Sequence, residues 1–125
     1  MEFEDHLLMA KIAEESKLYK SVVDFMLPVF RAKKYLLSTQ ERTLLEKAWK
    51  ALIDEKREAI RKIEAIEKDV EYAQHASALY LYRIKIKREL VQECRRAIRS
   101  INQVVLQDSA LLSKIFEYEQ ENEKI

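Results

Sequence analysis

Apolar residues recur along this chain at the spacing of amphipathic helices, and the pattern predicts five of them. Helices are expected from about Phe3 to Ser16, from Leu18 to Lys34, from Ser38 through an apolar stripe that ends at Val70, from about Ala78 to Val105, and from about Ser109 onward. The polar stretch from Gln74 to Ser77 is expected to form a turn. The acidic tail after Glu117 is expected to fray.

Local signals refine two of these helices. Ser38 followed by Glu41 matches a capping box, which predicts that the third helix begins there. Pro28 lacks a backbone N–H and is expected to interrupt or bend the second helix. Trp49 lies on the apolar stripe of the third helix, and we interpret it as a packing residue.

The composition favours the same architecture. The chain has no glycine, one proline and 36% charged residues, so it holds little material for turns or strands. These features predict an all-α protein, an antiparallel helical bundle of about five helices in a single domain of residues 1–125. The absence of glycine also excludes P-loop and Rossmann nucleotide sites, because both need glycine where the backbone approaches phosphate.

Charge and titratable residues exclude further classes. With 23 basic and 22 acidic residues the net charge is +1, so the whole chain is not expected to attract nucleic acid or a membrane surface. Cys94 is the one cysteine, which suits a reducing compartment, and its apolar neighbours predict a buried thiol. His6 and His75 stand apart from other metal-ligating residues, so both are expected at the surface and no metal site is predicted.

No catalytic set can be assembled from neighbouring motifs. The sequence offers no nucleophile with a base and no carboxylate pair, so we expect neither an enzyme nor a cofactor. The acidic start, Met1 to Asp5, does not look like a signal peptide, and no apolar run approaches the ~20 residues needed to span a bilayer. A soluble, cytoplasmic protein is therefore predicted.

The most informative side chains are three cations on the third helix. Arg57 and Arg61 each fall within roughly 20° of Lys50 around a helix, so the three cations form one stripe. Like charges one turn apart, as at Arg57 and Arg61, are unfavourable unless an anion lies over them. Ion pairs with Asp54 and Glu46 on the same helix account for the pattern equally simply, as a solvated face.

The segment from Leu37 to Arg61 resembles the third-helix signature of the 14-3-3 family. The matching positions are Leu37, Ser38, Glu41, Arg42, Leu44, Leu45, Ala48, Lys50, Arg57 and Arg61. The stretch from Ala10 to Glu14 with Tyr19 resembles the family's first helix, and Tyr82 to Leu90 with Cys94 resembles its fourth. The likeness runs from about Ala10 to Phe116. It implies the fold of the N-terminal half of a 14-3-3 protein.

In function, the resemblance implies a dimeric signalling adaptor that binds phosphoserine or phosphothreonine motifs of client proteins. Lys50 and Arg57 would bind the phosphate, with Arg61 beside them. The family completes this site with an Arg-Tyr pair on its fifth helix. Here Ser113 to Phe116 begins that motif and the pair does not follow, so the groove is incomplete and we expect the sequence to be part of a longer chain.

The resemblance also implies a dimer seam between the first helix of one chain and the third and fourth helices of another. Residues that match it are Ile12, Ser16, Ile63, Tyr82, Lys85, Ile86 and Glu89. The usual charged partners of Lys85 and Glu89 are replaced by Leu18 and Ser21. A homodimer held by apolar contacts is therefore expected.

Two alternatives remain open from the sequence. A purely structural helical bundle needs no ligand at all. A nucleic-acid-binding module could use the basic residues between Arg83 and Arg99, although no recognised motif accompanies them and we expect no nucleic-acid partner.

Overall fold

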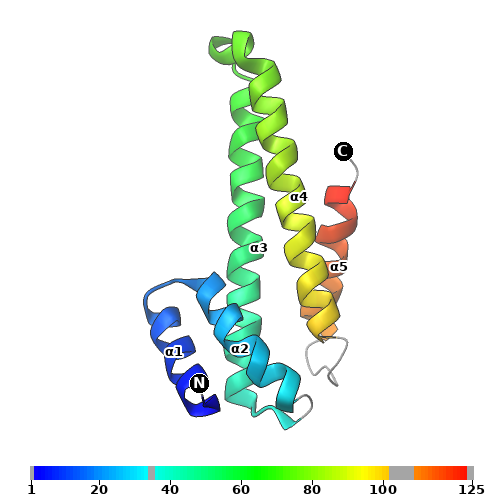
Figure 1. The fold of residues 1–125 in the computed structure, drawn as a ribbon. Helices are drawn as coiled ribbons and strands as arrows, with labels where there is room; N and C mark the ends of the chain where they lie inside the picture. The colour runs from blue at the N-terminus through cyan, green and yellow to red at the C-terminus, as the bar shows by residue number, and fades with distance from the viewer. Residues whose placement is uncertain (1, 34–35, 102–108, 124–125) are drawn as a thin grey trace. The chain divides into compact units, whose positions relative to one another are not determined.

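The chain is all-α, as predicted. The structure, a computed structural model, describes residues 2–33, 36–101 and 109–123 (Figure 1). Its helices are α1 (Phe3–Glu15), α2 (Tyr19–Lys33), α3 (Thr39–Glu67), the 3-10 helix η2 (Val70–His75), α4 (Ala76–Ile101) and α5 (Ser109–Glu123). No strand occurs in these ranges. The expected helix from Ala78 to Val105 therefore begins slightly earlier, and residues 102–105 lie outside the described part.

The helices group into two compact units. The first comprises Met1–Leu52 with Arg99–Gln107, and the second comprises Ile53–Ile98 with Asp108–Ile125. The boundary falls within α3, so Lys50 belongs to the first unit, and Arg57 and Arg61 belong to the second.

The first unit has its core between α1, α2 and the start of α3. α1 packs against α2, and the half-buried His6 ring donates from Nδ1 to the Phe25 carbonyl at 3.1 Å. His6 thus keeps part of its surface accessible, but its ring has a partner inside the unit. Trp49 is 1% exposed, which confirms that it packs in the core. Other buried residues are Ala10, Ala13, Val22, Val23, Met26, Leu27, Val29, Phe30, Leu44, Leu45 and Ala48.

A chain without glycine must end its first helix on another residue. Lys17 has φ 59°, in the left-handed region that glycine usually occupies. The Lys17 and Leu18 amides donate to the carbonyls of Glu14 and Ala13 at 2.9 and 2.8 Å. These two bonds form a Schellman motif, which satisfies the last carbonyls of α1 and turns the chain into α2.

Pro28 lies inside α2 without ending it. The expected interruption is wrong, because the helix is continuous from Tyr19 to Lys33, whereas the expected bend at Pro28 stays a prediction. Proline inside a helix costs about 3 kcal/mol, whereas each fully buried large apolar side chain contributes about 1.5–3 kcal/mol. Met26, Leu27, Val29 and Phe30 surround Pro28 in sequence and are all buried, so packing outweighs the missing hydrogen bond.

The predicted capping box at the start of α3 is confirmed. The Ser38 amide donates to Glu41 Oε1 at 3.0 Å, and the Glu41 amide donates to Ser38 Oγ at 3.1 Å. The same carboxylate accepts from Lys33 Nζ at 2.9 Å, so it also ties α2 to α3. Burial alone would raise the pKa of Glu41, but the Ser38 amide and Lys33 outweigh it and the pKa is lowered.

This carboxylate predicts an acid-sensitive fold. Because the pKa of Glu41 is lower in the folded state than in the unfolded state, its contribution is fully present above about pH 5 and is lost as the pH falls through the lowered pKa. We expect Glu41→Gln to reduce the free energy of unfolding by about 1 kcal/mol at pH 7 and by less at pH 3. Denaturant unfolding measures this, with exposed Glu55→Gln as the control. A deficit that stayed constant with pH would contradict it.

The second unit joins the remainder of α3 to α4 and α5. Lys56 pairs with Glu89 and Arg83 with Glu67, each at 2.7 Å, so α3 and α4 run antiparallel. Arg95 of α4 pairs with Glu119 at 3.7 Å and with Glu123, and α5 runs antiparallel to α4 (Figure 1). The core holds Ile53, Ile60, Ile63, Ile84, Ile86, Leu90, Val91, Cys94, Ala97, Ile98 and Ile115.

Three expectations about this unit need correction. The apolar stripe of α3 leaves the core after Ile63, because Ile66 is 39% and Val70 86% exposed. In place of the expected turn from Gln74 to Ser77, the 3-10 helix η2 ends at His75 and α4 begins at Ala76. The tail after Glu117 is helical through Glu123, since Asn122 is buried and Glu119 and Glu123 pair with Arg95.

Candidate functional site

A small pocket in the second unit gathers basic residues from two helices. Its volume is about 200 Å³. The lining residues are Arg57, Ile60, Arg61 and Glu64 of α3, Lys87 of α4, and Glu121 and Asn122 of α5. Three cations thus face two carboxylates, which leaves a formal charge of +1 in the lining. Such a set can bind an anion through charge-assisted hydrogen bonds.

Arg57 is the most constrained of the three cations. Its side chain is 31% exposed, and its Cζ lies 3.8 Å from the centroid of the Tyr118 ring. Nη1 is also 3.8 Å from Asp54 Oδ1, which is too long for a hydrogen bond. Asp54 therefore contributes a nearby charge, and it does not occupy the donors of the guanidinium group.

Arg61 lies one turn further along α3 and is more accessible. It pairs with Glu58 at 2.9 Å, with the two side chains 64% and 52% exposed. An exposed pair of this kind contributes only about 0 to 1 kcal/mol. An anionic ligand can therefore displace Glu58 from Arg61 at small cost.

Lys50 is exposed on α3 in the first unit and is not among the residues that line the pocket. Of the three predicted phosphate ligands, Arg57 and Arg61 therefore share this pocket. The assignment of Lys50 stays a prediction based on its place on the same helix and on the family resemblance.

Sequence reasoning missed the contributions of α4 and α5. Lys87 had been grouped with the basic residues of the fourth helix, and Tyr118, Glu121 and Asn122 had been placed in a fraying tail. One signal was available: Ile115, Tyr118 and Asn122 follow one another at spacings of three and four residues, as expected for one face of a continued helix.

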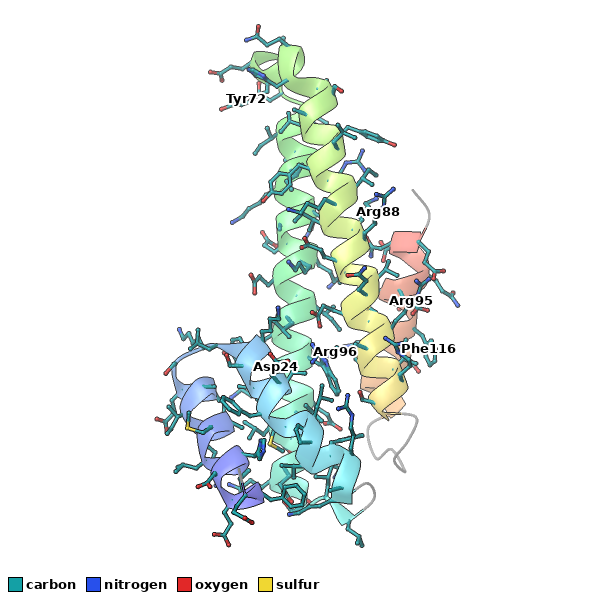
Figure 2. The ribbon with its side chains drawn as sticks, in the orientation of Figure 1. Asp24, Tyr72, Arg88, Arg95, Arg96 and Phe116 are labelled. Carbon is teal, nitrogen blue, oxygen red and sulfur yellow. The ribbon has the colours of Figure 1, made fainter. Side chains whose placement is uncertain are left out.

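The basic residues of α4 do not act as one uniform surface. Arg83 pairs with Glu67 and makes a cation–π contact with Tyr80, and Arg95 pairs with two glutamates of α5. Arg96 also has an interaction of its own. Figure 2 shows Arg88, Arg95 and Arg96 on successive parts of this helix. Because Arg83 and Arg95 are paired with carboxylates within the protein, the cluster is less suited to nucleic acid than its sequence indicated.

Cys94 is buried, as predicted. Burial, together with the charges of Glu119 and Glu93, raises its pKa to about 12. The thiol therefore stays protonated near neutral pH, so it is a poor nucleophile and a poor metal ligand. His75 is exposed, as expected, in η2. None of the helices in the described ranges combines the length and hydropathy needed to cross a membrane.

The predicted seam residues differ in accessibility. Ile12 is 48% and Tyr82 53% exposed, whereas Ile63 and Ile86 keep only 8% and 7% of their surface accessible. Ser16 and Lys85 are exposed. Glu89 is not free to form an ion pair with a second chain, because its carboxylate already accepts a hydrogen bond from Lys56 Nζ at 2.7 Å. This bond lowers the pKa of Glu89.

The fold and the pocket together define an all-helical protein with paired arginines displayed on its third helix. The family model described as 14-3-3 protein matches residues 9–122. The chain therefore belongs to the 14-3-3 family.

Individual relatives agree with this assignment. The chain is 33% identical over 117 residues to a 14-3-3-like protein of Solanum tuberosum, covering 90% of this chain and 45% of that protein. It is 31% identical over 117 residues to 14-3-3 protein 2 of Entamoeba histolytica, covering 90% and 49%. Against 14-3-3-like protein A of Vicia faba the identity is 34% over 118 residues, covering 90% and 45%. The chain thus spans about half the length of these relatives.

Proposed function

We propose that this chain is part of a dimeric, cytoplasmic signalling adaptor that binds phosphoserine or phosphothreonine motifs of client proteins. The observation that carries the proposal is the pocket in which Arg57 and Arg61, both at family positions, meet Lys87. Binding needs no chemical step, and members of this family are adaptors rather than enzymes.

The chemistry of the lining favours a phosphate group. Arg57 and Arg61 present planar forks that match phosphate oxygens, and Lys87 adds a compact point charge. Lys50 would add a further point charge from α3. The carboxylates of Glu64 and Glu121 repel an anion, so they lower the affinity that the cations would otherwise provide.

A pair of matched peptides tests the proposal. We expect a phosphoserine peptide to bind more tightly than its unphosphorylated twin in isothermal titration calorimetry. Glu121→Gln removes a like charge from the pocket and should strengthen binding of the phosphorylated peptide by up to about fivefold, the effect of a surface charge pair. The unphosphorylated peptide should not respond.

Glu117→Gln is the matched control. Glu117 is also an exposed glutamate of α5, but it does not line the pocket of Arg57 and Arg61. It changes the net charge by the same amount, so equal gains in both variants would indicate a general charge effect. Equal binding of the two peptides by the intact, full-length protein would overturn the proposed function.

Dimerisation is supported by the exposed apolar side chains of the first unit. Phe3, Leu8, Met9 and Ile12 of α1 are 38–56% exposed. Such a surface gains free energy when a partner covers it, roughly 25 cal/mol per Å² of apolar area. A second copy of the chain, joined through Ile12 and Ser16 to Tyr82 and Lys85 of its partner, is the arrangement we propose.

A further inference from the structure

The pocket has an aromatic neighbour on α5 that the family signature does not predict. The Tyr118 ring lies against the Arg57 guanidinium group with Cζ 3.8 Å from its centroid. A guanidinium group standing on edge would point an N–H at the ring and hold Cζ further away. The short distance therefore favours a flat stack, in which the ring covers one face of Arg57.

A flat stack leaves the donors of Arg57 available. Guanidinium N–H groups lie in the plane of the group, so a ring over its face occupies none of them. The stack also restricts a side chain that would otherwise sample many rotamers. Arg57 can then meet an anion with less loss of conformational entropy, which is the general benefit of pre-organisation.

Contacts of neighbouring residues on α5 hold Tyr118 in position. Asn122 Nδ2 donates to the Tyr118 carbonyl at 2.8 Å, and Asn122 is 8% exposed and lines the same pocket. Ile115 is 1% exposed, and Arg95 of α4 pairs with Glu119. α5 is thus held on both sides of Tyr118 in the sequence, and the ring has a defined place over Arg57.

We propose that Tyr118 is a positioning residue of the phosphate pocket, which stacks on Arg57 and presents its N–H edge to the ligand. The inference rests on the proposed function. It assigns to α5 a role in phosphate recognition that uses the aromatic ring and does not require the tyrosine hydroxyl group.

Two substitutions separate the ring from the hydroxyl group. We expect Tyr118→Leu to weaken binding of a phosphoserine peptide by about two- to fivefold, the range of a partly exposed cation–π contact. Tyr118→Phe should bind like the wild type. Tyr80→Leu is the matched control, because it removes another tyrosine–arginine cation–π contact of the same unit, between Tyr80 and Arg83 at 5.2 Å, that is not part of the pocket.

An NMR readout reports on the stack directly. The Arg57 Hε signal should carry a ring-current shift in the wild type and in Tyr118→Phe, and should lose it in Tyr118→Leu. Because the wild-type signal can be compared with the position expected for an unstacked arginine, the measurement decides even if Tyr118→Leu does not fold. An unshifted signal in the wild type would overturn the inference.

The binding outcomes distinguish the two proposals. If the wild type does not prefer the phosphorylated peptide, both the proposed function and this inference fail. If it does, and Tyr118→Leu binds as tightly as the wild type, only the inference fails. Equal losses in Tyr118→Leu and Tyr118→Phe would assign the effect to the hydroxyl group and would likewise overturn it.

Discussion

Replacement of Arg57 by alanine is expected to weaken binding of a phosphoserine peptide by roughly ten- to hundredfold. Hydrogen bonds to charged groups contribute about 1.5–3 kcal/mol, and Arg57 is the cation that the structure holds in place at the pocket. Binding of the unphosphorylated twin should change little. Isothermal titration calorimetry of both peptides measures the difference, which should decrease as salt is added.

Arg88→Ala provides the control for net charge. Arg88 is an exposed cation of α4 that does not line the pocket (Figure 2). Arg57→Lys should fall between the wild type and Arg57→Ala, because lysine keeps the charge but loses the planar fork. If Arg57→Ala and Arg88→Ala lost affinity equally, the attraction would come from overall charge, and Arg57 would have no specific role.

The second large effect concerns the proposed dimer. We expect the wild-type chain to sediment as a dimer at micromolar concentration and Ile12→Glu to sediment as a monomer. Ile12 is 48% exposed within the chain, so the substitution should leave the fold and its melting temperature nearly unchanged. In the dimer, however, it would place an unpaired carboxylate in an apolar seam, which is strongly unfavourable.

Leu36→Glu is the matched control for this experiment. Leu36 is 75% exposed, lies before α3 and is not one of the proposed seam residues, so the same chemical change there should leave the dimer intact. A wild-type chain that is monomeric at micromolar concentration would contradict the proposal, as would an Ile12→Glu variant that stays dimeric.

Apolar contacts have to hold the proposed dimer, because this chain lacks the charged partners that the family pairs with Lys85 and Glu89. Glu89 is engaged by Lys56 within the chain, while Leu18 and Ser21 occupy the positions where the family has charged partners. Exposed ion pairs contribute only about 0 to 1 kcal/mol, so their loss is compatible with a dimer. It should reduce selectivity between partners more than affinity.

Local sequence features predicted most of the secondary structure. The Ser38 and Glu41 pair located the start of α3 because a capping box forms between residues three apart and needs no distant partner. The apolar periodicity likewise placed Trp49 in the core and predicted a buried thiol at Cys94. The capping box and the buried positions could be predicted because they depend on the spacing of residues along one helix, and the sequence alone determines that spacing.

The tertiary structure decided what depends on other helices. Pro28 stays within α2 because its buried neighbours outweigh a local defect, and α5 continues to Glu123 because Arg95 pairs with two of its glutamates. Lys87 and Tyr118 reach Arg57 only after three helices have packed together. The sequence by itself determined an all-helical 14-3-3 scaffold and two of its pocket arginines. Packing between segments distant in sequence decided which residues surround them, because such contacts follow no local period.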